Sequence, residues 1–292
     1  MPDTTDREAI VDSSNPLGLQ GIEFVEVATP RPQALGQVLE LMGFSPVARH
    51  RSREVLLYRQ GGMNVIVNAH AAALAAGPAA DGAPWLAAIA LRVHDAGAAH
   101  RRAIEQGAWE VPVQVAPMEL HIPAIHGVGA SRIYFVDRHR DFSIYDVDFV
   151  TIPGVERHPP ALAGMHWFGI VQYIGVDRLD DWCAFYAGLF GFQLLPQNRH
   201  FGVLPRGRVL QSPCGTFYLQ LIEPESADAD GDERLQRVAF GTPDVLAAVA
   251  ALRARGVAFV EGRGVHSEAR GALTEPRLGG LAFELVHRAE PA

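Results

Sequence analysis

The second half of this 292-residue chain repeats landmarks of the first half at a nearly constant distance. Leu-Met-Gly-Phe around Gly43 recurs as Leu-Phe-Gly-Phe around Gly191, 148 residues later. An Asp-capped helix pattern that ends at Gly107 recurs with its end at Gly256, 149 residues later. Self-similarity at a fixed offset is the sequence signature of a duplicated unit. The repeat therefore predicts two domains of one fold.

Each domain divides further into two units of similar pattern. Residues 168–192 show apolar and polar residues alternating as in a strand, then apolar residues at helical spacing that stop at a glycine. Residues 235–257 follow the same order, as do residues 21–43 and 85–108. The stretches SRIYFVD and FSIYDVDF are expected to close the second unit as strands. Such units, joined by hairpins, form small open barrels with the pocket inside.

The expected domain boundaries follow from composition. Residues 1–15 carry no periodicity and are expected to form a flexible arm, and residues 151–164 are dense in Pro and Gly, as linkers are. Between and after them lie an N-terminal domain, residues 16–150, and a C-terminal domain, residues 165–292.

Bulk composition excludes several classes of protein. A formal charge of −8 without clusters of Lys and Arg argues against nucleic acid as a partner. No apolar run is long enough to span a bilayer, and the acidic start is unlike a signal peptide, so we expect a cytoplasmic protein without a membrane partner. Cys183 and Cys214 have neither disulfide nor metal spacing and are expected to stay reduced. Homo-oligomerisation is left open.

Candidate binding residues lie on the strands of the second domain. Tyr173, Gln220 and Arg237 belong to predicted strand faces that line its barrel. Glu284 stands in the middle of an apolar strand, where a carboxylate is costly to bury without a partner. An edge-strand Glu that points to solvent is the alternative, and an ordinary strand Gln is the plainer interpretation of Gln220.

Several long stretches resemble the 4-hydroxyphenylpyruvate dioxygenase family of the vicinal oxygen chelate superfamily. They extend over nearly the whole chain and read NPLGLQGIEFVEVATP, HRSREVLLYRQGGMNVIVN, PMELHIPAIHGVGASRIYFVDR, SIYDVDFV, GVERHP, WCAFYAGLFGF and LAFELVHR. The resemblance implies an α+β class with a duplicated vicinal oxygen chelate fold, in which four βαβββ modules form two open barrels.

The same resemblance implies an iron(II) site in the second domain, held by two His and one Glu. The Glu falls on Glu284, but the two His positions fall on Gly169 and Arg237. His166 lies three residues before Gly169, and an odd shift along a strand turns a side chain to the opposite face unless a bulge intervenes. We therefore expect no metal or other cofactor, with Glu284 and His166 as the ligands to examine if a metal is found.

The substitution also predicts a replacement for the metal. The family brings its second His and its Glu to one ion. Arg237, in place of that His, should therefore reach Glu284 and form a guanidinium–carboxylate ion pair where the metal would lie. The pair could be purely structural, or Arg237 could keep a spare face for the carboxylate of a ligand.

The first domain offers no comparable ligand set. The repeat places the counterpart of Arg237 near Ala88 and that of Glu284 near Tyr145. Glu23 and Glu26 are expected either to have hydrogen-bond partners or to face the solvent. We interpret this half as a scaffold.

Three functions remain open. The first is binding of a small acidic or aromatic molecule, or non-oxidative chemistry on it, in the C-terminal barrel of a protein with a degenerate iron site. The second is a genuine Fe(II)-dependent dioxygenase, with Fe(II) as its cofactor. The third is a non-catalytic scaffold or interaction protein. Whether the protein is an enzyme is thus undecided from the sequence, and no catalytic residue is assigned.

Overall fold

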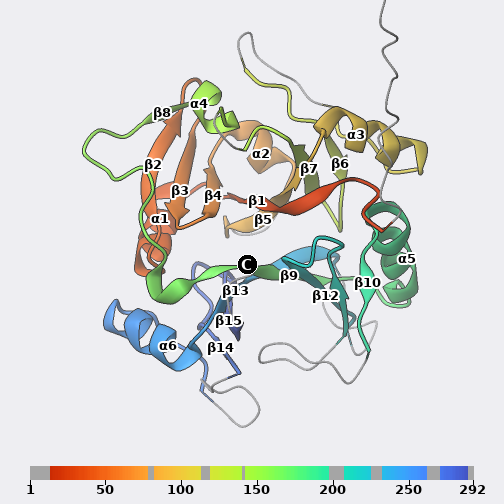
Figure 1. Ribbon diagram of the computed structural model, residues 1–292. Helices are drawn as coiled ribbons and strands as arrows, with labels where there is room; N and C mark the ends of the chain where they lie inside the picture. Colours follow the sequence, from red (N-terminus) through yellow and green to blue (C-terminus); the bar gives the residue numbers. More distant parts are fainter. Residues whose placement is uncertain are drawn as a thin grey trace, which may run out of the picture.

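The computed structural model describes residues 14–77, 82–112, 119–139, 142–196, 207–224, 232–261 and 270–288. Residues 1–13 of the expected N-terminal arm lie outside this part. The chain forms two halves, which Figure 1 shows one above the other.

Two modules build the N-terminal half. The first contains β1 (Leu19–Ala28), α1 (Pro32–Leu41), β2 (Ser45–His50), β3 (Val55–Gln60), β4 (Met63–Asn68) and the short α2 (Ala71–Ala75). The second contains β5 (Trp85–Val93), α3 (Ala96–Glu105), β6 (Ala124–His126), β7 (Arg132–Val136), α4 (Ile144–Asp148) and β8 (Phe149–Thr151).

The C-terminal half begins after a short 3-10 turn, η1 (Leu162–Gly164), and repeats the strand and helix order of the N-terminal half. Its first module contains β9 (His166–Tyr173), α5 (Leu179–Phe190), β10 (Gln193–Leu194), β11 (Arg208–Gln211) and β12 (Tyr218–Ile222). Its second module contains β13 (Arg234–Thr242), α6 (Val245–Ala254), β14 (Gly271–Leu273) and β15 (Phe283–His287).

Local sequence signals set the helix ends. The side chain of Asp95 accepts a hydrogen bond from the Ala98 amide at 2.7 Å, and that of Asp244 accepts one from Ala247 at 2.9 Å. These are N-caps of α3 and α6, which satisfy amides that have no partner within the helix. Helix α5 ends at Gly191, whose φ of +78° is accessible to glycine without strain. The predicted helix signals are confirmed.

Strand pairing in the two halves is the same, which confirms the duplication. In the first half β1 pairs parallel with β4 and antiparallel with β5, and β5 pairs parallel with β7. In the second half β9 pairs parallel with β12 and antiparallel with β13, and β13 pairs parallel with β15. A single pairing of Leu235 with Leu86 joins the two into one sheet that does not close.

Helices α1, α3, α5 and α6 cover one face of this sheet, and one hydrophobic core there draws residues from both halves. The rings of Phe44 and Phe240 lie 5.8 Å apart, and Arg255 after α6 donates to the carbonyl oxygens of Glu40 and Leu41 at the end of α1. The opposite face, here called the inner face, carries separate apolar clusters in the two halves. Each half therefore has its own inner surface where a site could form.

Helix α4 corrects the expectation that FSIYDVDF is a strand. Ser143 and Asp146 form a capping box that starts the helix, and Ile144 and Tyr145 pack on the inner face of the N-terminal half. The strand that corresponds to β15 is therefore β7. Since Ala239 pairs with Glu284 as Ala90 pairs with Tyr134, the counterpart of Glu284 is Tyr134 and not a residue near Tyr145.

Within the described residues, no helix is both long and apolar enough to cross a membrane. Localisation in the cytoplasm stays a prediction.

Candidate functional site

Three strands bring the candidate residues of the C-terminal half together at Ala239. On β13, Ala239 pairs with Gly169 of β9 on one side and with Glu284 of β15 on the other. Arg237 lies two residues before Ala239, so its side chain leaves the strand on the same face. The register alone therefore makes these positions converge on the inner face.

Arg237 and Glu284 form a buried ion pair. The Nε atom of Arg237 donates to Oε2 of Glu284 at 3.2 Å, and the two side chains are 5% and 3% exposed. The pair that the sequence predicts is present. The Nη2 atom of Arg237 is buried as well and has no hydrogen-bond partner among the described residues. One donor of the guanidinium thus remains available.

The cavity beside Glu284 is small, and Arg237 does not line it. A cavity of about 20 Å³ is lined by Gly169, Gln220, Glu284 and neighbouring apolar side chains. A volume of this size is about that needed to hold one water molecule. Tyr173 lies further along β9, where the guanidinium carbon of Arg234 stands 5.2 Å from its ring centre. Gln220 thus shares a cavity with Glu284, whereas Tyr173 does not line it.

Comparison with known proteins identifies the family. Residues 13–150 match the family model described as "Hydroxyphenylpyruvate dioxygenase, HPPD, N-terminal", and residues 164–285 match the "Glyoxalase/Bleomycin resistance protein/Dioxygenase superfamily". The 4-hydroxyphenylpyruvate dioxygenase of Pseudomonas sp. (strain P.J. 874) is 36% identical over 262 residues, which cover 84% of this chain and 72% of the relative. The chain belongs to the 4-hydroxyphenylpyruvate dioxygenase family.

Solved structures of this family and of its superfamily share the fold. A xylose isomerase-like TIM barrel/4-hydroxyphenylpyruvate dioxygenase fusion protein aligns with a TM-score of 0.71 at 26% identity, over 94% of this chain and 50% of the fusion protein. A triple mutant of 4-hydroxymandelate synthase from Streptomyces coelicolor aligns with a TM-score of 0.71 at 18% identity, over 94% of both chains. The second likeness supports the vicinal oxygen chelate fold alone.

The three positions that the family resemblance assigns to iron do not fit that ion in this chain. Gly169 has no ligand atom, and Arg237 brings a positive charge to within hydrogen-bonding distance of Glu284. A facial triad needs two imidazoles besides the carboxylate. A Cβ atom on Gly169 would moreover stand 2.2 Å from the carbonyl oxygen of Tyr218 on the adjacent strand. The backbone of β12 therefore leaves no space for a side chain at this position.

His166 lies on the inner face, because β9 contains the irregularity that could turn it there. The register of β9 with β13 shifts between Ala239 and Phe240, so that Gly169 is opposite Ala239 and His166 is opposite Gly241. The Nδ1 atom of His166 lies 3.1 Å from the carbonyl oxygen of Gly164. In the described parts of the chain, no three His, Cys, Asp or Glu side chains form a group that could hold a metal.

The larger cavities of the described residues lie elsewhere. On the inner face of the N-terminal half, α4 stands between a cavity of about 380 Å³ and one of about 150 Å³, and Tyr145 lines both. A third, of about 690 Å³, lies between the halves beside Leu86 and Leu235. The prediction that the pocket belongs to the C-terminal half therefore stays a prediction. Sequence reasoning missed the two cavities beside α4 because it treated α4 as a strand.

Glu23 and Glu26 are buried and satisfied, as the sequence analysis allowed. Glu23 accepts from Arg92 and from the Asn64 side chain, and Glu26 accepts from the Asn68 side chain at 2.8 Å. Burial raises the pKa of Glu26, against the lowering effect of that hydrogen bond and of Arg132. The N-terminal half thus holds two carboxylates deep on its inner face.

Proposed function

We propose that this protein is a non-oxidative member of its family, in which an internal ion pair has replaced the iron of the C-terminal barrel. The observation that carries this proposal is the buried contact of Arg237 with Glu284. A fixed guanidinium next to the remaining carboxylate opposes a divalent cation at the same place. The function that remains to such a barrel is binding of a small acidic or aromatic molecule, or chemistry on it without oxygen activation.

The proposed recognition element is the free edge of Arg237. Its Nη2 atom is a buried donor without a partner in the described residues, and leaving such a donor unpaired costs free energy. A ligand carboxylate is the acceptor that fits a guanidinium edge best. Arg237 does not line the cavity beside Glu284, whose volume is only about 20 Å³, so the ligand reaches the guanidinium with a rearrangement of the side chains between them.

The binding experiment uses 4-hydroxyphenylpyruvate, which is both acidic and aromatic, as the probe. Calorimetric titration of the metal-free protein should show saturable binding that Arg237→Met weakens at least tenfold and Glu284→Gln weakens less. Equal weakening by both changes would favour a purely structural pair. Oxygen uptake stoichiometric with the keto acid, in iron-supplemented protein, would contradict the non-oxidative proposal.

A second candidate is a genuine Fe(II)-dependent dioxygenase, which the 36% identity to a 4-hydroxyphenylpyruvate dioxygenase favours. In that enzyme His166 and Glu284 would both bind the ion. The register shift in β9 supports this candidate because it turns His166 to the inner face. Formation of homogentisate that is lost on His166→Ala would establish this candidate.

A third candidate is a non-catalytic scaffold, which the small size of the C-terminal cavity favours. In that case Arg237 and Glu284 act on stability alone. Absence of saturable binding of any carboxylate to the C-terminal half, together with a large stability loss in the single variants, would distinguish it from the first candidate.

A further inference from the structure

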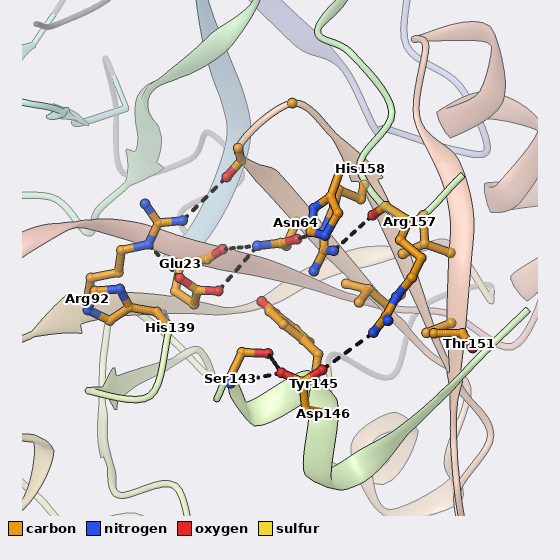
Figure 2. Close-up of a pocket in the computed structure, with 16 residues that line it drawn as sticks. Glu23, Asn64, Arg92, His139, Ser143, Tyr145, Asp146, Thr151, Arg157 and His158 are labelled. Atoms are coloured by element: carbon orange, nitrogen blue, oxygen red, sulfur yellow. Dashed lines mark hydrogen bonds and ion pairs between the residues drawn. The ribbon is translucent and has the colours of Figure 1, made fainter. Parts of the chain in front are cut away.

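The cavity of about 380 Å³ in the N-terminal half has a polar end and an apolar wall. Figure 2 shows Tyr145 reaching from α4 into the space between Glu23 and Asn64, with Arg92 on one side. Val47, Ala48 and Leu57 belong to the apolar cluster of the inner face and line the same cavity. A volume above about 300 Å³ is within the range of small-molecule sites.

Arg59 provides a positive charge in this cavity that no carboxylate neutralises by direct contact. Its Nε atom donates to Oδ1 of Asn64 at 2.7 Å and its Nη1 atom donates to the carbonyl oxygen of Arg157 at 3.0 Å. Both acceptors are neutral. The guanidinium is half-buried, and this burial lowers its pKa, which is the direction expected for a cation without a direct counter-ion.

Tyr145 places a hydroxyl donor between Arg59 and Glu23. The side chain is 8% exposed, and its hydroxyl has no hydrogen-bond partner among the described residues. The guanidinium carbon of Arg59 lies 5.2 Å from the centre of the Tyr145 ring. Burial, the charge of Glu23 and the approach of the hydroxyl to that carboxylate hold the pKa of Tyr145 well above its usual value, so the hydroxyl stays protonated and can donate.

The acidic groups of the cavity are already engaged. Arg92 pairs with Glu23, and Arg157 lies with its Nη2 atom 3.4 Å from Oδ1 of Asp146 at the exposed edge. Of the three arginines, Arg59 alone has no acidic partner within the described residues. A ligand with a single negative charge would therefore neutralise the remaining positive charge of Arg59.

We propose that this cavity is a second binding site, for a small monocarboxylate with an apolar body. The carboxylate accepts from the Tyr145 hydroxyl and from the free edge of Arg59, and the apolar body lies against Val47, Ala48 and Leu57. This site is separate from Arg237 and does not depend on the function proposed for the C-terminal barrel.

Benzoate and hexanoate are the probes, each compared with its neutral amide by calorimetric titration of the full chain. Both acids should bind saturably, and benzamide and hexanamide should bind at least tenfold more weakly, because the amides lack the negative charge. Amides that bind as well as the acids would overturn the proposal, as would acids that do not saturate.

The variants Tyr145→Phe and Arg59→Met should each weaken benzoate binding at least tenfold. The matched controls Tyr134→Phe and Arg132→Met remove a hydroxyl and a half-buried guanidinium from the same half, and neither residue lines this cavity. Both controls should leave the affinity within twofold. Unchanged affinity in Tyr145→Phe, or an equal loss in Tyr134→Phe, would overturn the assignment.

A crystal of the unaltered protein with 4-iodobenzoate keeps the test independent of whether the variants fold. The iodine should give an anomalous peak beside Val47 and Leu57, with the carboxylate at Tyr145. Peaks in other cavities alone, or no peak at saturating concentration, would contradict the proposal.

Discussion

Arg237 and Glu284 meet at 3.2 Å across two adjacent parallel strands, with both side chains almost entirely buried. Removal of one member leaves the other as an uncompensated buried charge, so Arg237→Met and Glu284→Leu should each lower the free energy of unfolding by about 3 to 5 kcal/mol. The double variant should recover much of this loss, because an apolar pair needs no counter-ion. Urea denaturation of the four proteins measures the coupling.

The matched control is Arg253→Met with Glu261→Leu. This pair lies at the surface, with side chains 47% and 74% exposed, and the single changes should have little effect. Strictly additive effects of the Arg237 and Glu284 changes would mean that the two residues do not interact in solution.

Gly169→Ala should destabilise the protein by about 1 to 3 kcal/mol, since the added methyl group meets the Tyr218 carbonyl oxygen at 2.2 Å. The control is Gly188→Ala on the exposed side of α5, where no atom lies within 4 Å of the added carbon and the helix should gain about 0.5 to 1 kcal/mol. Thermal denaturation compares the two. A stable Gly169→Ala protein would mean that a side chain fits at the position that the family resemblance assigns to a ligand.

Much of the fold follows from short sequence signals whose physics is local. Asp95 and Asp244 cap helices in both halves, and the glycine at 191 ends α5, because these residues satisfy amides or adopt a positive φ within one turn. The contact of Arg237 with Glu284 was also predictable, because the resemblance places both residues at positions that the family brings to one metal ion.

Other features were not predicted, either because a local signal was missed or because they depend on packing between distant elements. The stretch around Tyr145 alternates like a strand, and its Ser143 and Asp146 capping box was the signal that was missed. The register shift in β9 that turns His166 to the inner face leaves no trace in residue type. The cavity beside Arg59 exists only because α4 packs against the sheet.

Glu26→Gln should stabilise the protein at pH 7 and have little effect below pH 4. The folded state holds the proton of Glu26 more tightly than the unfolded chain, because burial raises its pKa. Protonated Glu26 therefore favours the folded state at low pH. This contribution is lost as the pH rises from the pKa of the unfolded chain, about 4.5, through the higher pKa of the folded state. The side chain of Gln keeps an acceptor for Asn68 and removes the charge.

Urea denaturation at several pH values checks this prediction, with Glu156→Gln as an exposed control that should shift nothing. A stabilisation by Glu26→Gln that is the same at pH 4 and pH 7 would show that the charge is not its cause.

The iron content of the protein tests the replacement of the metal by Arg237 most directly. Protein purified without chelator should be loaded anaerobically with Fe(II), separated from free metal and analysed by atomic absorption. The ion pair predicts far less than one equivalent of iron, and no change in that content on Glu284→Ala. About one equivalent of iron, lost on Glu284→Ala and on His166→Ala, would contradict the replacement and establish a working metal site.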